Sequence, residues 1–157
     1  MNSRLKRFVM GLARGLHTRW TKLRRPVTLG VKAAIYDQAG RVLLVKHSYV
    51  EGWHLPGGGV SRDECQSDAA RREVAEELGL TLTGEMTMVG VYFAPHLGKS
   101  DHITLFRAAE WEGNITPNWE IAEAGFFHLH ELPNGITAAT RRRLDEMAGH
   151  RPVDERW

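Results

Sequence analysis

Features that are scarce in this chain exclude several classes of protein. A single cysteine, Cys65, among 157 residues excludes an internal disulfide framework and fits a reducing compartment such as the cytoplasm. No segment approaches the roughly 20 consecutive apolar residues that a membrane-spanning helix needs. The longest apolar run near the N-terminus, residues 8–13, is shorter than a typical signal-peptide core. We therefore expect a globular protein that is located in the cytoplasm.

Acidic residues are missing from the first 36 positions, although the net charge of the whole chain is only +2. These positions hold nine Lys or Arg, and the first acidic residue is Asp37. The rest of the chain therefore carries 12 basic and 19 acidic side chains, a balance of −7. An acidic body is typical of a protein that binds metal cations, whereas the basic N-terminal segment needs a separate explanation.

The pattern of apolar residues predicts a mixture of strands and helices in one main domain. Within residues 1–25, apolar side chains recur every three or four positions, which predicts a basic amphipathic helix. We expect a domain over residues 26–150 and a tail over residues 151–157. Its expected strands are 27–36, 41–47, 53–55, 86–94, 102–109 and 124–129, and its expected helices are 66–78 and 136–147. Strands mixed with two core helices predict an α+β domain.

The most informative feature is a set of three carboxylates after a glycine-rich loop. Glu73, Glu76 and Glu77 are spaced i, i+3 and i+4, so they lie side by side on one face of the expected helix. Like charges at this spacing destabilise an isolated helix. Divalent cations with oxygen ligands would compensate, and such cations commonly act on phosphate substrates. The spacing therefore indicates a metal site for phosphorus chemistry, although a solvated acidic helix face would look similar.

The segment from Gly58 to Leu80 resembles the Nudix box, the signature of the Nudix hydrolases. The pattern is Gly, five residues, Glu, seven residues, Arg-Glu, an aliphatic residue, any residue, Glu-Glu, any residue, Gly and an aliphatic residue. The chain satisfies its nine fixed positions with Gly58, Glu64, Arg72, Glu73, Val74, Glu76, Glu77, Gly79 and Leu80. Segments 52–57, 120–127 and 131–133 also resemble the family. The resemblance implies a mixed β-sheet sandwiched between α-helices.

The resemblance also implies roles for individual residues. Glu73, Glu76 and Glu77 would hold Mg²⁺, with Mn²⁺ as the alternative ion, and the backbone carbonyl of Gly57 would be a further ligand. Gly58, Glu64 and Arg72 would be structural, because in the family this arginine and glutamate clamp the loop to the helix. Glu64 could also contribute to the metal site.

One position departs from the pattern of the family. Where family sequences often place Ser or Thr after the box glutamate, this chain has Cys65, which is a poor helix N-cap. Asp63, Ser67 and Asp68 are the alternative caps. We expect a slightly frayed start of the helix and no loss of activity.

The general base is not fixed by the motif. Members of the family use either a glutamate of the box or one on a later loop, so the candidates are Glu76, Glu77, Glu120 and Glu123, with Asp101 and Glu112 as weaker possibilities. The reaction implied is hydrolysis of a pyrophosphate bond in a nucleoside diphosphate linked to another moiety. Pro95 resembles a mark of ADP-ribose pyrophosphatases and favours an ADP-ribose or nucleotide-sugar type of substrate. Dinucleoside polyphosphates and nucleoside triphosphates are the alternatives, and a nucleotide sensor without activity is the competing class.

The partners of the basic segment 1–25 stay open at this point. Its apolar stripe could pack on the domain, or on a second subunit in a homodimer. Its Lys and Arg among Phe, Leu and Trp are also typical of a helix at a membrane surface, and a cleavable transit sequence would look alike. An aromatic platform for RNA is lacking, so no nucleic-acid partner is expected.

Overall fold

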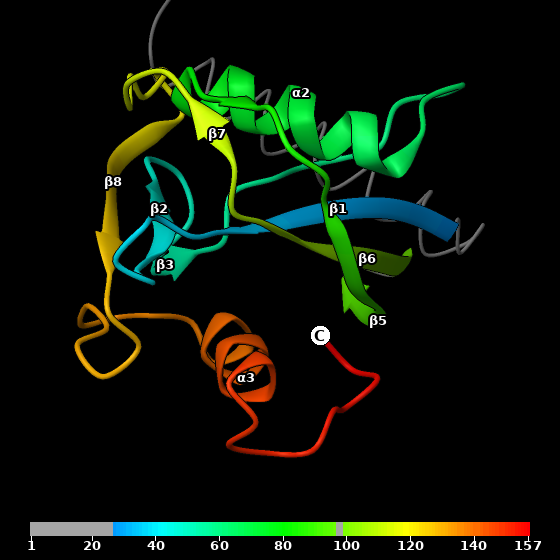
Figure 1. Ribbon diagram of the computed structural model, residues 1–157. Coiled ribbons are helices and arrows are strands. Elements are labelled where there is room, and N and C mark those ends of the chain that lie inside the picture. Colours follow the sequence, from blue (N-terminus) through cyan, green and yellow to red (C-terminus); the bar gives the residue numbers. More distant parts are fainter. Residues whose placement is uncertain (1–26, 97–98) are drawn as a thin grey trace, which may run out of the picture.

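The computed structural model describes residues 27–96 and 99–157, and its helices lie on opposite sides of the strands (Figure 1). Helix α2 (Gln66–Leu78) covers one side, and helix α3 (Ala138–Met147) covers the other. The amphipathic helix expected over residues 1–25 lies outside the described residues. The two helices enclose strands of mixed direction, so the expected α+β fold is confirmed.

The described strands form three small sheets. The first sheet has the order β1-β6-β5, made of Val27–Ile35, Lys99–Ala108 and Thr87–His96. Strand β1 pairs with β6 in parallel, whereas β5 and β6 are antiparallel. The second sheet has the order β3-β2-β8, made of Trp53–His54, Val42–His47 and Ile121–Phe127. The third sheet pairs β4 (Thr81–Leu82) with β7 (Trp111–Glu112).

Strands β1 and β2 are buried on both faces, which explains why they read as continuous apolar runs. Alternate residues point to opposite faces of a strand. Ala33 and Val45 pack with Val74 and Leu78 of α2, while their neighbours on the other face pack around Leu144 of α3. The packing of α2 against β1 and β2 fixes the helix that carries the three carboxylates.

Helix α2 begins and ends where the sequence predicts. Gly79 follows it with φ +69°, a left-handed conformation that glycine adopts without strain, and donates its amide to the Ala75 carbonyl. Cys65 is the N-cap residue and makes no side-chain capping hydrogen bond. Helix α3 begins two residues later than expected, because the Thr137 side chain caps it by accepting from the Thr140 amide at 3.2 Å.

Three parts of the sheets differ from the sequence prediction. Strand β6 begins at Lys99, three residues before the expected start. Strand β8 begins at Ile121, three residues before the expected start, and includes Glu123. The short strands β4 and β7 were not expected, because two-residue strands carry too little periodicity to be read from sequence.

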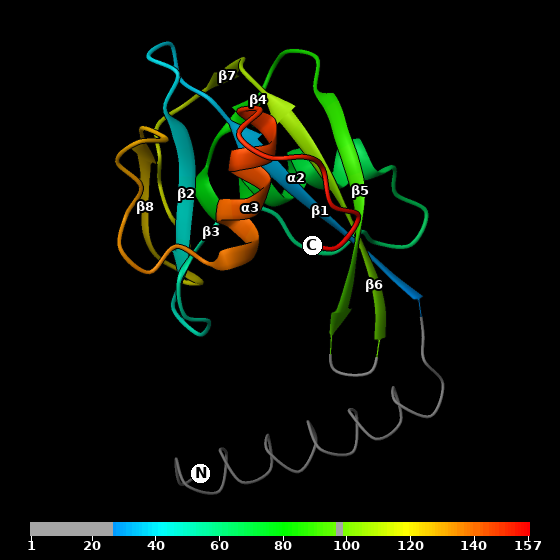
Figure 2. The same cartoon turned by 90° about the horizontal axis from the view of Figure 1, so that it is seen from below.

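The last residues of the chain pair with the edge of the first sheet, alongside β5 (Figure 2). The Phe93 amide donates to the Glu155 carbonyl at 2.7 Å, and the Trp157 amide donates to the Phe93 carbonyl at 2.9 Å. The Trp157 ring packs edge-on against Tyr92, with ring centroids 5.7 Å apart. Residues 155–157 therefore cover part of an otherwise open strand edge.

Candidate active site

The glycine-rich loop is held against β1 by backbone hydrogen bonds. The amides of Val31 and Ala33 donate to the carbonyls of Gly58 and Pro56, each at 2.9 Å. Gly57 has φ +128°, and a Cβ at this position would collide with the Val31 carbonyl. A Cβ on Gly58 would collide with the carboxylate of Glu73. Close approach of the loop to β1 therefore requires glycine at position 57, whereas a side chain at position 58 would displace the Glu73 carboxylate.

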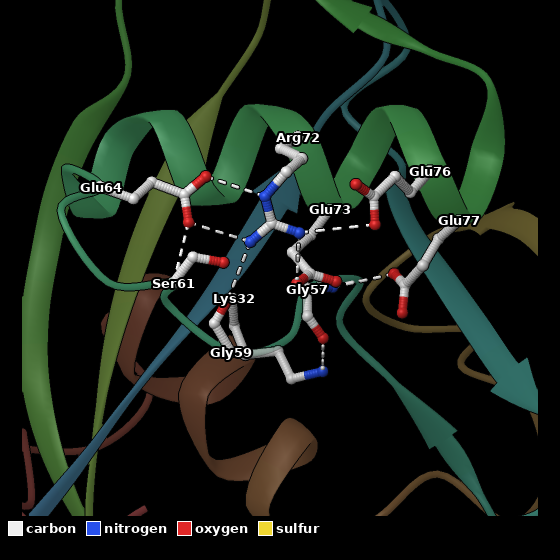
Figure 3. Close-up of polar contacts among 9 residues, drawn as sticks. All are labelled: Lys32, Gly57, Gly59, Ser61, Glu64, Arg72, Glu73, Glu76 and Glu77. Carbon is white, nitrogen blue, oxygen red and sulfur yellow. Dashed lines mark hydrogen bonds and ion pairs between the residues drawn. The ribbon is translucent and has the colours of Figure 1, made fainter.

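Arg72 joins the loop to the helix and contacts three glutamates (Figure 3). Its Nε and Nη2 donate to the two carboxylate oxygens of Glu64, at 2.8 and 3.0 Å. Its Nη1 donates to Glu73 at 2.8 Å and to Glu76 at 3.4 Å, and Nη2 also reaches the Gly59 carbonyl at 3.0 Å. Arg72 and Glu64 thus form the pair that the resemblance implies. Hydrogen bonds from Arg72 and from the Ser61 amide lower the pKa of Glu64 to about 2.

Glu77 is the most buried of the three helix carboxylates, with 4% of the residue exposed. Its Oε2 accepts the Gly57 amide at 2.9 Å, and its Oε1 lies 3.8 Å from Nε2 of His47. Burial raises the pKa of Glu77 to about 6, against the opposing charge of Lys32. The carboxylate of Glu120 adds to this rise, so the two groups are close enough to influence each other.

Lys32 is a cation of the site that the sequence analysis did not identify. Its Nζ donates to the Gly57 carbonyl at 2.7 Å. Burial lowers the pKa of Lys32, whereas the charges of Glu77 and Glu73 oppose this change. The available signal was a lysine between Val31 and Ala33 in a strand whose apolar residues predict burial on both faces.

Strand β2 and the loop after it contribute aromatic side chains to the site that the sequence analysis also did not identify. The ring of His47 lies 5.3 Å from that of Tyr49 and 5.7 Å from that of His54, between centroids. Burial lowers the pKa of His47 to about 4, with a smaller effect from Lys32. Within the described residues, its buried Nδ1 has no hydrogen-bond partner. The pKa of Tyr49 is raised by burial and then by Glu120 and Glu77, which places this exposed phenol beside the carboxylates.

The two loop candidates for the general base lie in different surroundings. The Glu120 carbonyl accepts the Ser48 amide at 2.8 Å, which holds the start of β8 against the loop of Tyr49. Glu123 instead forms an exposed ion pair with Lys46 at 2.8 Å. Lys46 alternates with Val45, which packs toward α2, so Lys46 and Glu123 lie on the opposite face of the second sheet. The structure therefore brings Glu120, but not Glu123, toward Glu77.

The donor chemistry of the site fits a hard divalent cation. The box glutamates and the Gly57 carbonyl provide oxygen ligands of the kind that Mg²⁺ and Mn²⁺ prefer. Across residues 27–96 and 99–157, no three His, Cys, Asp or Glu side chains converge on a single point. Arg72 donates to Glu73 and Glu76, and Lys32 donates to the Gly57 carbonyl.

A cavity of about 940 Å³ opens beside the glycine loop. It lies between β1, the loop and β6, and its lining includes Lys32, Gly57, Gly58, Asp63 and Asp101. A space of this size is sufficient for a nucleotide. Residues of the site thus border a cavity that the sequence could not reveal.

None of the described helices is long and apolar enough to cross a membrane.

Comparison with known proteins agrees with this geometry. The NUDIX domain model matches residues 26–147, so the chain belongs to the Nudix family. A solved structure of a MutT NUDIX hydrolase from Burkholderia pseudomallei is 31% identical, with a TM-score of 0.68 over 76% of this chain and 96% of that one.

Two curated relatives are less completely covered. The CTP pyrophosphohydrolase of Escherichia coli is 32% identical over 54% of this chain and 65% of its own length. The ADP-ribose pyrophosphatase of Methanocaldococcus jannaschii is 30% identical over 63% of this chain and 61% of its own length. The chain spans about half the length of two other bacterial relatives, 50% of one and 43% of the other.

Proposed function

We propose that this protein hydrolyses a pyrophosphate bond in a nucleoside diphosphate linked to another moiety, in a metal-dependent reaction. The observation that carries the proposal is the position of Glu77, buried on α2 and hydrogen-bonded to the Gly57 amide of the loop. This contact joins Glu77 to the loop, whose Gly57 and Gly58 line a cavity of nucleotide size. Such an arrangement suits binding of a cation together with a phosphate substrate.

Each residue has a proposed part in the reaction. Glu73, Glu76, Glu77 and the Gly57 carbonyl would hold Mg²⁺ or Mn²⁺. Bound there, the ion would neutralise phosphate charge and make water a better nucleophile. Attack of the water oxygen on phosphorus forms a new P–O bond, breaks the bond to the bridging oxygen and releases two phosphate-bearing products.

A carboxylate must take the proton of the attacking water. Glu120 is our first choice because its charge acts on Glu77 and Tyr49, and its carbonyl accepts the Ser48 amide in the loop of Tyr49. Glu77 is the second choice, since it is a glutamate of the box that is buried and bonded to the Gly57 amide of the loop. Glu76 and Glu123 are weaker candidates. Arg72 holds Glu76, and Lys46 holds Glu123 on the opposite face of the sheet.

A nucleoside triphosphate is the second candidate substrate. It is favoured by the E. coli relative, which is named a CTP pyrophosphohydrolase, and by the solved MutT structure, of which this chain covers 96%. The M. jannaschii relative, named an ADP-ribose pyrophosphatase, supports the first candidate. A sensor without activity is disfavoured, because such a protein has no need for a complete set of box glutamates.

Release of phosphate-bearing products from a panel of nucleotides tests the proposal. The panel contains ADP-ribose, nucleotide sugars, dinucleoside polyphosphates and nucleoside triphosphates, each assayed with Mg²⁺, with Mn²⁺ and with chelator. We expect cleavage of one class, abolished by chelator. Glu77→Gln should reduce kcat by about 10²-fold or more while the circular dichroism spectrum stays unchanged. Glu85→Gln, a change at an exposed loop residue, is the matched control.

Nucleotide binding without cleavage of any class would instead establish the sensor. The identity of the products separates the substrates, because a triphosphate yields inorganic pyrophosphate or phosphate and ADP-ribose yields two monophosphates.

The role of residues 1–25 and the cytoplasmic location stay predictions. We propose that this segment packs on the domain or on a second copy, because exposed apolar side chains lie where the described chain begins. Val27 is 68% exposed and Leu29 is 45% exposed. Deleting residues 1–25 should leave kcat unchanged if the box performs the chemistry. Light scattering and liposome sedimentation of both forms would separate a dimer contact from a membrane contact.

A further inference from the structure

Lys32 is a half-buried cation that the proposed reaction does not use. Its neighbours on β1, Val31 and Ala33, are fully buried, and its side chain reaches the glycine loop (Figure 3). There its Nζ donates to the Gly57 carbonyl at 2.7 Å. This is the same oxygen that a divalent cation would use at the proposed site.

Both backbone polar groups of Gly57 are bonded to charged side chains, and the two side chains have opposite charges. The Glu77 carboxylate accepts a hydrogen bond from the Gly57 amide at 2.9 Å, and the Lys32 ammonium donates one to the Gly57 carbonyl. The Lys32 charge acts on both Glu77 and Glu73, two of the three proposed carboxylate ligands. Lys32 therefore provides part of the positive charge beside the buried Glu77 and the half-buried Glu73.

An ammonium and a divalent cation cannot easily share this environment. Both are attracted by the same carbonyl and carboxylates, and two cations a few ångströms apart in a protein interior repel strongly. Arg72 holds Glu73 and Glu76 in a similar way, but its main partner is Glu64, outside the proposed ligand set. Lys32 is thus the cation whose hydrogen bond competes directly for a proposed metal ligand.

We propose that Lys32 is a placeholder cation, which occupies the Gly57 carbonyl and balances Glu73 and Glu77 until a divalent cation displaces it. The inference rests on the proposed function, because it takes Gly57 and the box glutamates as metal ligands. It has two consequences. Metal binds more weakly than the carboxylates alone would allow, and the loop keeps its conformation in the metal-free protein.

Binding of Mn²⁺ to the full chain, measured by electron paramagnetic resonance without nucleotide, tests the competition. Lys32→Met removes the charge and the hydrogen bond, whereas Lys32→Gln removes the charge and keeps an N–H donor. Lys46→Gln is the matched control, because Lys46 is an exposed lysine on the opposite face of the neighbouring sheet. We expect both Lys32 variants to bind Mn²⁺ at least about fivefold more tightly than wild type, and the control to match wild type.

Equal or weaker Mn²⁺ binding by folded Lys32 variants would overturn the placeholder role. Failure of the wild-type chain to bind Mn²⁺ would instead refute the metal site of the proposed function, so the two failures are distinguishable. A second measurement needs no variant. Mg²⁺ should shift the Hε–Cε nuclear magnetic resonance signal of Lys32 and leave that of Lys46 in place, and an unmoved Lys32 signal would contradict the proposal even if the variants did not fold.

Discussion

Arg72 holds both carboxylate oxygens of Glu64 with two parallel hydrogen bonds of 2.8 and 3.0 Å. The same guanidinium reaches Glu73 on the helix and the Gly59 carbonyl on the loop. This bidentate pair fixes the spacing between loop and helix, on which the position of the other carboxylates depends.

The Glu64–Arg72 pair should make stability depend on acid pH. Pairing lowers the pKa of Glu64 from its ordinary value of 4.5 to about 2. In the window between these values, the unfolded carboxyl takes up a proton while the folded one stays charged. The contribution of this pair to the free energy of unfolding is therefore complete above pH 4.5 and is lost as the pH falls toward 2. Thermal unfolding of Glu64→Gln across this range should show a flatter decline than wild type. Glu85→Gln, at an exposed loop residue, should decline as wild type does.

Gly57 and Gly59 offer a direct test of where the loop requires glycine. Alanine at position 57 must adopt φ +128° and place its Cβ against the Val31 carbonyl. We expect Gly57→Ala to destabilise the fold by about 2 kcal/mol or more. A Cβ on Gly59 meets no atom within 4 Å, so Gly59→Ala should change stability by less than about 0.5 kcal/mol. Urea unfolding of both variants measures the difference. Equal effects would show that the loop tolerates a side chain at position 57.

Cys65→Ser should stabilise the protein slightly. Cys65 has the extended conformation of an N-cap, with φ −71° and ψ 146°, yet its side chain makes no capping hydrogen bond. A serine hydroxyl at this position could accept a free amide of the first turn of α2, which typically contributes about 0.5–1 kcal/mol. Differential scanning calorimetry would measure the shift in Tm, with Cys65→Ala as the control that removes the thiol without adding an acceptor. Loss of kcat in a folded Cys65→Ser variant would assign a role to the thiol.

Arg143 should be essential for stability and neutral for activity. The residue is fully buried, donates to Glu146 at 2.7 Å and to the Asp154 carbonyl at 2.9 Å, and lies 4.0 Å above the Tyr92 ring. Arg143→Met leaves the buried Glu146 carboxylate with only a long contact of 3.9 Å to Arg151 and should cost about 3 kcal/mol. Arg142→Met breaks only a partly exposed contact of 3.9 Å and should cost less than about 1 kcal/mol. Chemical unfolding checks the stabilities, and kcat per folded molecule should be equal in the two variants.

The local elements near the motif could be read from sequence because their signals are local. The bounds of α2 follow from its apolar face and from Gly79, and both are confirmed. The pairing of Arg72 with Glu64 was implied by the box pattern, and it is present. The start of β8 was placed three residues late, since Glu120 and Glu123 give residues 120–123 an acidic character that resembles a loop. Pairing with β2 extends the strand to Ile121 despite this composition.

The sequence by itself determined the family, the helix that carries the three carboxylates and the glycines that let the loop approach it. These depend on residues close together in the chain, where spacing and backbone conformation have direct physical meaning. Tertiary structure alone decided that Lys32 and His47 join the carboxylates, that Glu120 lies nearer to them than Glu123, and that Arg143 anchors the C-terminal residues. These relationships arise where β1, β2 and the chain end pack against distant elements. Burial and opposite charge then set the chemistry of each group, and neither can be read from the order of residues.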